Sequence, residues 1–93
     1  MAVERRQPYQ LTEACIAAVR AERAAGYPQQ ELARLVGLSA MQLSCWLHHR
    51  YDYHRRPHPD DQRLKRLARV LELPVEACVE AVPPGQDRTG FAP

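Results

Sequence analysis

The stretch Gln29–His48, which reads QQELARLVGLSAMQLSCWLH, decides the fold. Ala33 is small where two helices must approach closely, and Gly37 follows four positions later, where a helix must end and the chain must turn. Leu43 and Trp46 then recur at helical spacing, so a second helix has an apolar side to pack against the first. The pattern predicts two short helices joined by a tight turn, a helix-turn-helix.

The rest of the chain predicts three further helices and no strand, so we expect an all-α domain of five helices. The fourth helix has the clearest period, because its apolar residues recur at positions i, i+3, i+4 and i+7. No segment alternates convincingly at the two-residue period of a β-strand. The expected helices cover about residues 12–25, 28–36, 39–48, from Asp60 or Asp61 to about 73, and 74–82.

Ninety-three residues suit one small domain. Residues 1–10 are charged and lack a period, which indicates a flexible N-terminal arm before a domain spanning residues 11–82. Residues 83–93 are rich in Pro and Gly and indicate a flexible C-terminal tail. Within the domain, residues 49–59 contain two prolines and little apolar character, which predicts a long loop between the third and fourth helices.

Positive charge is concentrated after the helix-turn-helix. Residues 48–69 contain seven Lys or Arg, three Asp and all four His, whereas the rest of the chain sums to a charge of −2. A solvated polar surface is one interpretation. The position beside a helix-turn-helix favours a surface that binds phosphates.

The three cysteines lie about thirty residues apart, which argues against a disulfide framework and predicts reduced, packed thiols. The chain has no apolar run long enough to span a membrane and no apolar signal segment at its start. We therefore expect no membrane association and a cytoplasmic protein.

The cysteines and histidines raise two chemical possibilities, a zinc site and a catalytic Cys–His pair. Zinc would need four ligands, and Cys45, His48, His54 and His58 lack the paired spacing of zinc motifs. A Cys–His catalytic pair lacks an orienting third residue and a loop to stabilise an oxyanion. We expect no metal site, no cofactor and no enzymatic activity.

The helix-turn-helix within five predicted helices resembles the lambda-repressor/Cro fold, and specifically the Xre-type transcriptional regulators, over about residues 11–82. Leu47 and His49 depart from the family, which commonly has an acidic residue and a glycine there, and the following loop is longer. The resemblance implies sequence-specific recognition of double-stranded DNA, most simply by a homodimeric repressor on a palindromic operator. The matching residues are Gln29, Leu32-Ala33, Gly37, Leu38-Ser39 and Ser44-Cys45-Trp46.

On a helix that starts after Ser39, one side should pack inward and the other should face DNA. We expect Leu43, Trp46 and Leu47 to face the core, while Met41 is open to either side. The outward side lacks arginine, so affinity should come largely from phosphates. The expected base-reading residues are Ala40, Met41, Gln42, Ser44, Cys45 and His48. The expected phosphate contacts are Gln29, which the resemblance implies, and Ser39, Arg50, Tyr51, Tyr53, Arg55 and Arg56.

The fifth predicted helix offers apolar residues for a homodimer interface, although the same residues could complete the monomer core. They are Leu73, Val75, Val79 and Val82. Two other functions stay open. One is an antitoxin whose terminal tail folds on a toxin, and the other is a protein-interaction module that uses the loop at residues 49–59.

Overall fold

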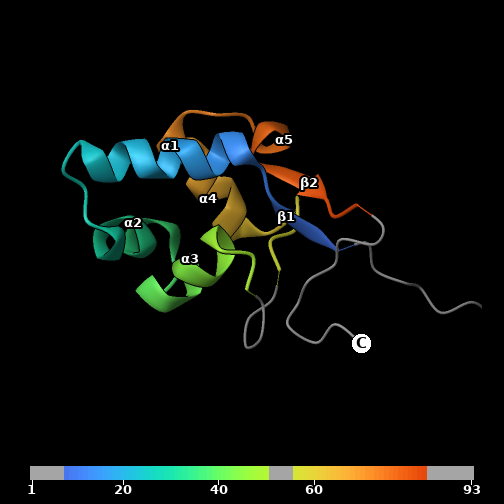
Figure 1. The fold of residues 1–93 in the computed structure, drawn as a ribbon, viewed down its shortest axis with the longest axis horizontal. Helices are drawn as coiled ribbons and strands as arrows, with labels where there is room; N and C mark the ends of the chain where they lie inside the picture. Colours follow the sequence, from blue (N-terminus) through green and yellow to red (C-terminus); the bar gives the residue numbers. More distant parts are fainter. Residues whose placement is uncertain (1–7, 51–55, 84–93) are drawn as a thin grey trace, which may run out of the picture.

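Five helices and one two-stranded sheet make up the part of the chain that the computed structural model describes, residues 8–50 and 56–83 (Figure 1). A mainly helical domain is therefore confirmed. In chain order the elements are β1 (Tyr9–Leu11), α1 (Glu13–Ala24), α2 (Gln29–Val36), α3 (Ala40–Leu47), α4 (Gln62–Leu71), α5 (Val75–Cys78) and β2 (Val79–Ala81).

The sheet corrects the expectation of an all-α domain. β1 pairs antiparallel with β2, and Leu11 stands opposite Val79 in the register. The predicted N-terminal arm does not extend to residue 10, because Tyr9 and Gln10 belong to β1. The fifth helix is also shorter than predicted: it ends at Cys78, and Val79 already has the extended backbone of β2. Strands of three residues are too short to display a two-residue period.

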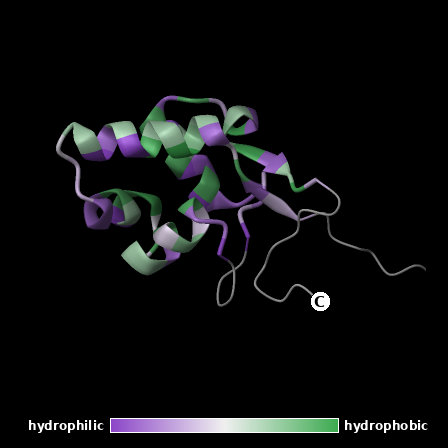
Figure 2. Cartoon of the chain, viewed as in Figure 1, coloured by the Kyte–Doolittle hydropathy of each residue, from purple (hydrophilic) through white to green (hydrophobic). Residues whose placement is uncertain are grey.

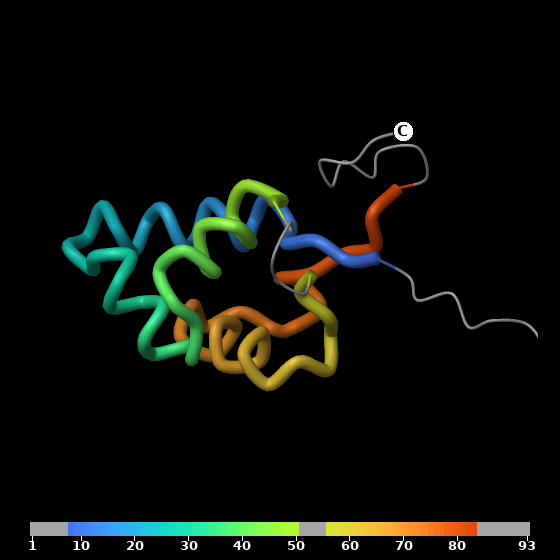
Figure 3. Tube along the Cα trace, turned by 90° about the horizontal axis from the view of Figure 1, so that it is seen from below, coloured from blue at the N-terminus to red at the C-terminus, as the bar shows by residue number. Residues whose placement is uncertain are grey.

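The sheet joins the two ends of the described chain. The backbone N–H of Val82 donates to the carbonyl oxygen of Pro8 at 2.9 Å. The Gln10 amide donates to a Glu80 carboxylate oxygen at 2.8 Å. Two views place the sheet at one end of the molecule and α2 at the other (Figures 1 and 3).

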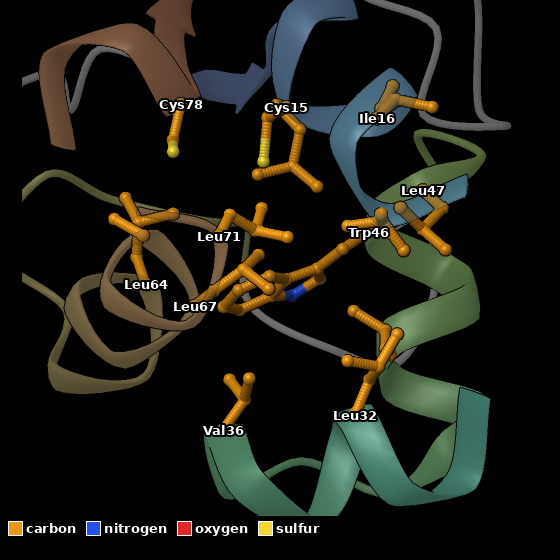
Figure 4. Close-up of a cluster of buried hydrophobic side chains, with 14 of the residues drawn as sticks. Cys15, Ile16, Leu32, Val36, Trp46, Leu47, Leu64, Leu67, Leu71 and Cys78 are labelled. Atoms are coloured by element: carbon orange, nitrogen blue, oxygen red, sulfur yellow. The ribbon is translucent and has the colours of Figure 1, made fainter. Parts of the chain in front are cut away.

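A single apolar core lies between the helices (Figure 4). Trp46 is 1% exposed and is among the largest fully buried side chains. Leucines of α2, α3 and α4 are the most numerous of the other core residues, and Cys15, Ile16 and Val19 from α1 and Cys78 from α5 join them. Within residues 8–50 and 56–83, no helix has both the length and the apolar character that crossing a bilayer requires.

Thr12 connects the start of α1 to the end of α5. As the N-cap of α1, its hydroxyl oxygen accepts the backbone N–H of Cys15 at 3.2 Å. The same hydroxyl donates to the carbonyl oxygen of Ala77 at 2.6 Å. The backbone N–H of Thr12 also donates to the carbonyl oxygen of Cys78 at 3.0 Å. One residue thus caps a helix and joins segments far apart in the sequence.

We expect Thr12→Ala to lower the free energy of unfolding by about 1–3 kcal/mol, because it removes the cap and leaves the Ala77 carbonyl without its donor. Thr12→Ser retains the hydroxyl and should cost less than about 1 kcal/mol. Urea denaturation followed by circular dichroism measures both. Equal losses for the two variants would show that the hydroxyl does not make this connection.

Candidate nucleic-acid interface

The turn between α2 and α3 depends on the backbone of Gly37. Its φ of +95° lies in the left-handed region, where a glycine has no Cβ to clash. The N–H groups of Gly37 and Leu38 both donate to the carbonyl oxygen of Ala33, at 2.9 and 2.8 Å. These bonds close the end of α2 and send the chain directly into α3, as the spacing of Ala33 and Gly37 predicts.

The start of α3 is fixed by a capping box between Ser39 and Gln42. The Ser39 hydroxyl accepts the Gln42 N–H at 3.0 Å, and the Gln42 side-chain oxygen accepts the Ser39 N–H at 2.9 Å. The expected start of this helix after Ser39 is therefore confirmed. Gln42, expected among the base-reading residues, also holds the helix start, so a substitution there changes two properties at once.

The outward side of α3 has no Asp, Glu, Lys or Arg and is partly exposed. Met41 is 67% exposed, which excludes a place in the core. Ala40, Ser44 and Cys45 are half-exposed. His48 is exposed at the C-terminal end, where its Nδ1 lies 3.0 Å from the carbonyl oxygen of Ser44.

Leu43, Trp46 and Leu47 occupy the opposite, buried side of α3, as predicted. The residues of α3 are mainly apolar or pale on the hydropathy scale, in contrast with the hydrophilic first turn of α2 (Figure 2). The helix therefore presents an apolar and weakly polar face to solvent.

The starts of α2 and α3 are joined by Gln29. Its side-chain amide donates to the carbonyl oxygen of Ala40 at 3.2 Å, which brings the two helix N-termini together. Pro28, the N-cap of α2, supplies no side-chain acceptor. The N-terminal end of α2 carries a partial positive charge from its backbone, which favours a nearby anion.

A shallow hollow beside this helix end is lined by arginines that the sequence analysis missed. Arg20 and Arg23 come from the last turns of α1, and Tyr27, Pro28 and Gln29 complete the hollow. Both arginines are exposed, and neither is ion-paired with a residue in ranges 8–50 and 56–83. In the sequence, these two arginines lie three positions apart near the end of the first predicted helix, and the second predicted helix follows directly.

Side chains near the N-terminus of α4 pack against the turn between α2 and α3 and against Trp46. Asp61 caps α4 and forms an ion pair with Arg63, whose Nη2 lies 2.9 Å from Asp61 Oδ2. The Arg63 guanidinium lies 5.7 Å from the centre of a Trp46 ring. A Cβ added to Gly37 would meet Arg66 Nη1 at 3.1 Å. The arginines of α4 thus pack against both the turn and the core tryptophan.

Asp61 is held in its charged form. Partial burial opposes ionisation, but the hydrogen bonds from the side chain and backbone of Arg63 outweigh it and lower the Asp61 pKa. The hydrogen bond to Asp61 likewise raises the pKa of Arg63. Asp61 and Arg63 are therefore both charged at neutral pH, and their ion pair lies at the N-terminus of α4.

Of the remaining predicted phosphate contacts, Arg50 lies just after α3, and its backbone N–H donates to the carbonyl oxygen of Cys45 at 2.7 Å. Arg50 is exposed and Arg56 is half-buried. Tyr51, Tyr53 and Arg55 lie outside the described residues. Of the predicted loop, Pro57 is fully buried, and the ring of His58 packs edge-on against Tyr9 at 5.1 Å between centres.

Two of the four proposed dimer residues are buried within the monomer. Val79 and Val82 are each 7% exposed, and Val79 lies in β2 rather than on a helix. Leu73 and Val75 are half-buried against the same core. Val79 and Val82 therefore belong to the monomer core, whereas Leu73 and Val75 keep part of their surface exposed.

The described ranges, 8–50 and 56–83, contain no group of three or more His, Cys, Asp or Glu that could hold a metal ion. His54, one of the zinc ligands weighed above, is outside those ranges. Comparisons of the chain with models of protein families, with curated proteins and with solved structures found no match.

Asp61→Asn should lower the free energy of unfolding by about 1 kcal/mol at neutral pH, because asparagine keeps the cap but loses the ion pair. The native pKa of Asp61 is depressed, so its stabilisation is present above about pH 4 and lost as the pH falls through the native pKa. Urea titrations between about pH 6 and pH 2 should show the two proteins converging in acid. A constant difference across that range would contradict the role of the Asp61 charge.

Proposed function

We propose that this protein is a sequence-specific regulator that binds double-stranded DNA through α2 and α3. The observation that carries the proposal is the placement of α3. It is held by its buried side against α2 and the core, directly after a glycine turn, and its other side is partly exposed. An exposed helix that follows such a turn suits the major groove, whose width admits one helix.

The charges around α2 support binding to the DNA backbone. Arg20 and Arg23 lie beside the N-terminal end of α2, where the helix dipole also favours a phosphate. The Gln29 side chain lies at the same place, where the resemblance to Xre-type regulators implies a phosphate contact. A phosphate in this hollow would place the start of α3 beside the base edges, because Gln29 connects the two helix ends.

The exposed side of α3 suits a particular kind of base contact. Ala40 and Met41 can pack against thymine methyl groups, and the Ser44 hydroxyl can bond a base edge. None of these side chains reads guanine in the bidentate way that arginine does. The proposed site therefore contains A·T pairs in its contacted positions and relies in part on DNA shape.

The first test concerns phosphates. In titrations of labelled duplexes at several salt concentrations, Arg20→Ala and Arg23→Ala should weaken binding to all sequences alike. Each should reduce the magnitude of the slope of log K against log salt by about 1, since one phosphate contact is lost. Arg34→Ala is the matched control. It removes the same single positive charge, but Arg34 is already ion-paired with Glu31 at 2.8 Å.

Equal changes in slope for all three arginine variants would contradict a specific role for the hollow. Wild-type protein that binds no duplex at low salt would reject the DNA proposal altogether.

The second test concerns the bases and starts from sites selected by wild-type protein from a random pool. Met41→Ala should reduce the preference for the selected site over random DNA about tenfold and leave stability unchanged, because the side chain is exposed. Leu35→Ala, which removes a 49%-exposed apolar side chain from α2, should leave the preference unchanged. Equal losses for both variants would place base recognition elsewhere than on α3.

A second candidate function, a protein-interaction module, is favoured by three exposed apolar side chains. Tyr27, Leu35 and Met41 are 48%, 49% and 67% exposed, and they lie at or next to α2 and α3. An apolar partner surface would cover them. In that case the wild-type protein binds no duplex at low salt.

A further inference from the structure

Two cysteines that the proposed function does not use face each other in the core. Cys15, in the first turn of α1, and Cys78, at the end of α5, are both 0% exposed. Figure 4 shows their side chains next to each other at one end of the buried cluster, with both sulfur atoms directed into the core. Both are free thiols, and the neighbouring Cys78 contributes to the raised pKa of Cys15.

The backbones that carry these thiols are fixed relative to each other. The Thr12 N–H bonds the carbonyl oxygen of Cys78 itself, and the Thr12 hydroxyl bonds that of Ala77. The next pair along, Leu11 and Val79, is aligned in the sheet. The backbone segments that carry the two cysteines are therefore held side by side by contacts on both segments.

We propose that Cys15 and Cys78 are a modification site, at which a disulfide bond forms within one chain and closes the start of α1 to the end of α5. This proposal is independent of DNA binding. The alternative is that both cysteines act only as small apolar residues of the core.

The reaction needs an external disulfide such as oxidised glutathione. One cysteine thiolate attacks it, forms a mixed disulfide and releases one glutathione thiol. The second cysteine then attacks the mixed disulfide and releases the second glutathione thiol. The two cysteines lose two protons and two electrons in total, and the oxidant is reduced to two thiols.

Access to the thiols controls the rate of this reaction. Burial raises the pKa of both cysteines above that of a free thiol, so the reactive thiolate is rare while the core is closed. Opening of the β1–β2 end would expose them. Oxidation is therefore slow in the folded protein, although the closed geometry favours the product.

The disulfide would enclose residues 15–78, nearly the whole domain. A cross-link over so long a loop restricts the unfolded chain strongly and should raise stability. The start of α1 and the end of α5, which carry these cysteines, adjoin β1 and β2 at the end of the molecule away from α2 (Figure 1). Its formation should thus stabilise the domain without altering the candidate interface.

The test uses the full chain with Cys45→Ser, which removes the half-exposed third thiol. Reduced protein is unfolded and refolded in glutathione buffers of graded redox ratio, so that the thiols meet the oxidant before burial. The fraction of Cys15–Cys78 disulfide at equilibrium is measured by mass spectrometry after acid quench. The same titration in concentrated urea gives the reference for the unfolded chain.

We expect the effective concentration of the two thiols to be at least about 30-fold higher in the folded protein than in urea, and the melting temperature of the oxidised form to rise by about 10 °C or more. Equal or lower effective concentration in the folded protein would overturn the proposal. So would products limited to mixed disulfides with glutathione or to cross-linked dimers. Either outcome would leave the cysteines as packing residues and would not affect the DNA-binding tests.

Discussion

The burial of the Trp46 indole is the contact on which the rest of the structure depends. Trp46 lies on α3, is 1% exposed, and reaches the leucines of α4 and the side chains of α2 (Figure 4). The Arg63 guanidinium covers it from the start of α4. Because this one large side chain fixes the rotation of α3, it also determines which residues of α3 face outward. Loss of the indole would remove both the core contact and the orientation of the exposed side.

Much of the helical part of the fold could be predicted, because its signals are local. Gly37 needs a left-handed backbone, Ser39 and Asp61 are good N-caps, and the leucines of α4 follow the helical period. The sheet could not be predicted in this way. Tyr9–Leu11 becomes a strand only through its pairing with Val79–Ala81, and nothing within three residues records a partner seventy positions away.

The candidate site was predictable only where it depends on one helix. The burial of Leu43 and Trp46 follows from their spacing on α3, whereas the same spacing leaves Met41 open to either side and the structure exposes it. Arg20 and Arg23 could not be recognised as phosphate-binding candidates from the distribution of charge along the chain. Only the fold brings the last turns of α1 beside the start of α2. Val79 was placed on the wrong element, because an apolar residue after a short helix suits a helix or a strand equally well.

We propose that α2 and α3 contact DNA, and that β1, α5 and β2, at the sheet end of the molecule, do not. The most direct measurement is a two-dimensional NMR titration of nitrogen-labelled protein with a duplex selected from a random pool. Amide shifts should change in the first turn of α2, along α3 and at Arg20 and Arg23. They should stay constant in β1, α5 and β2. Shifts confined to the sheet end, or no shifts at all, would contradict the claim.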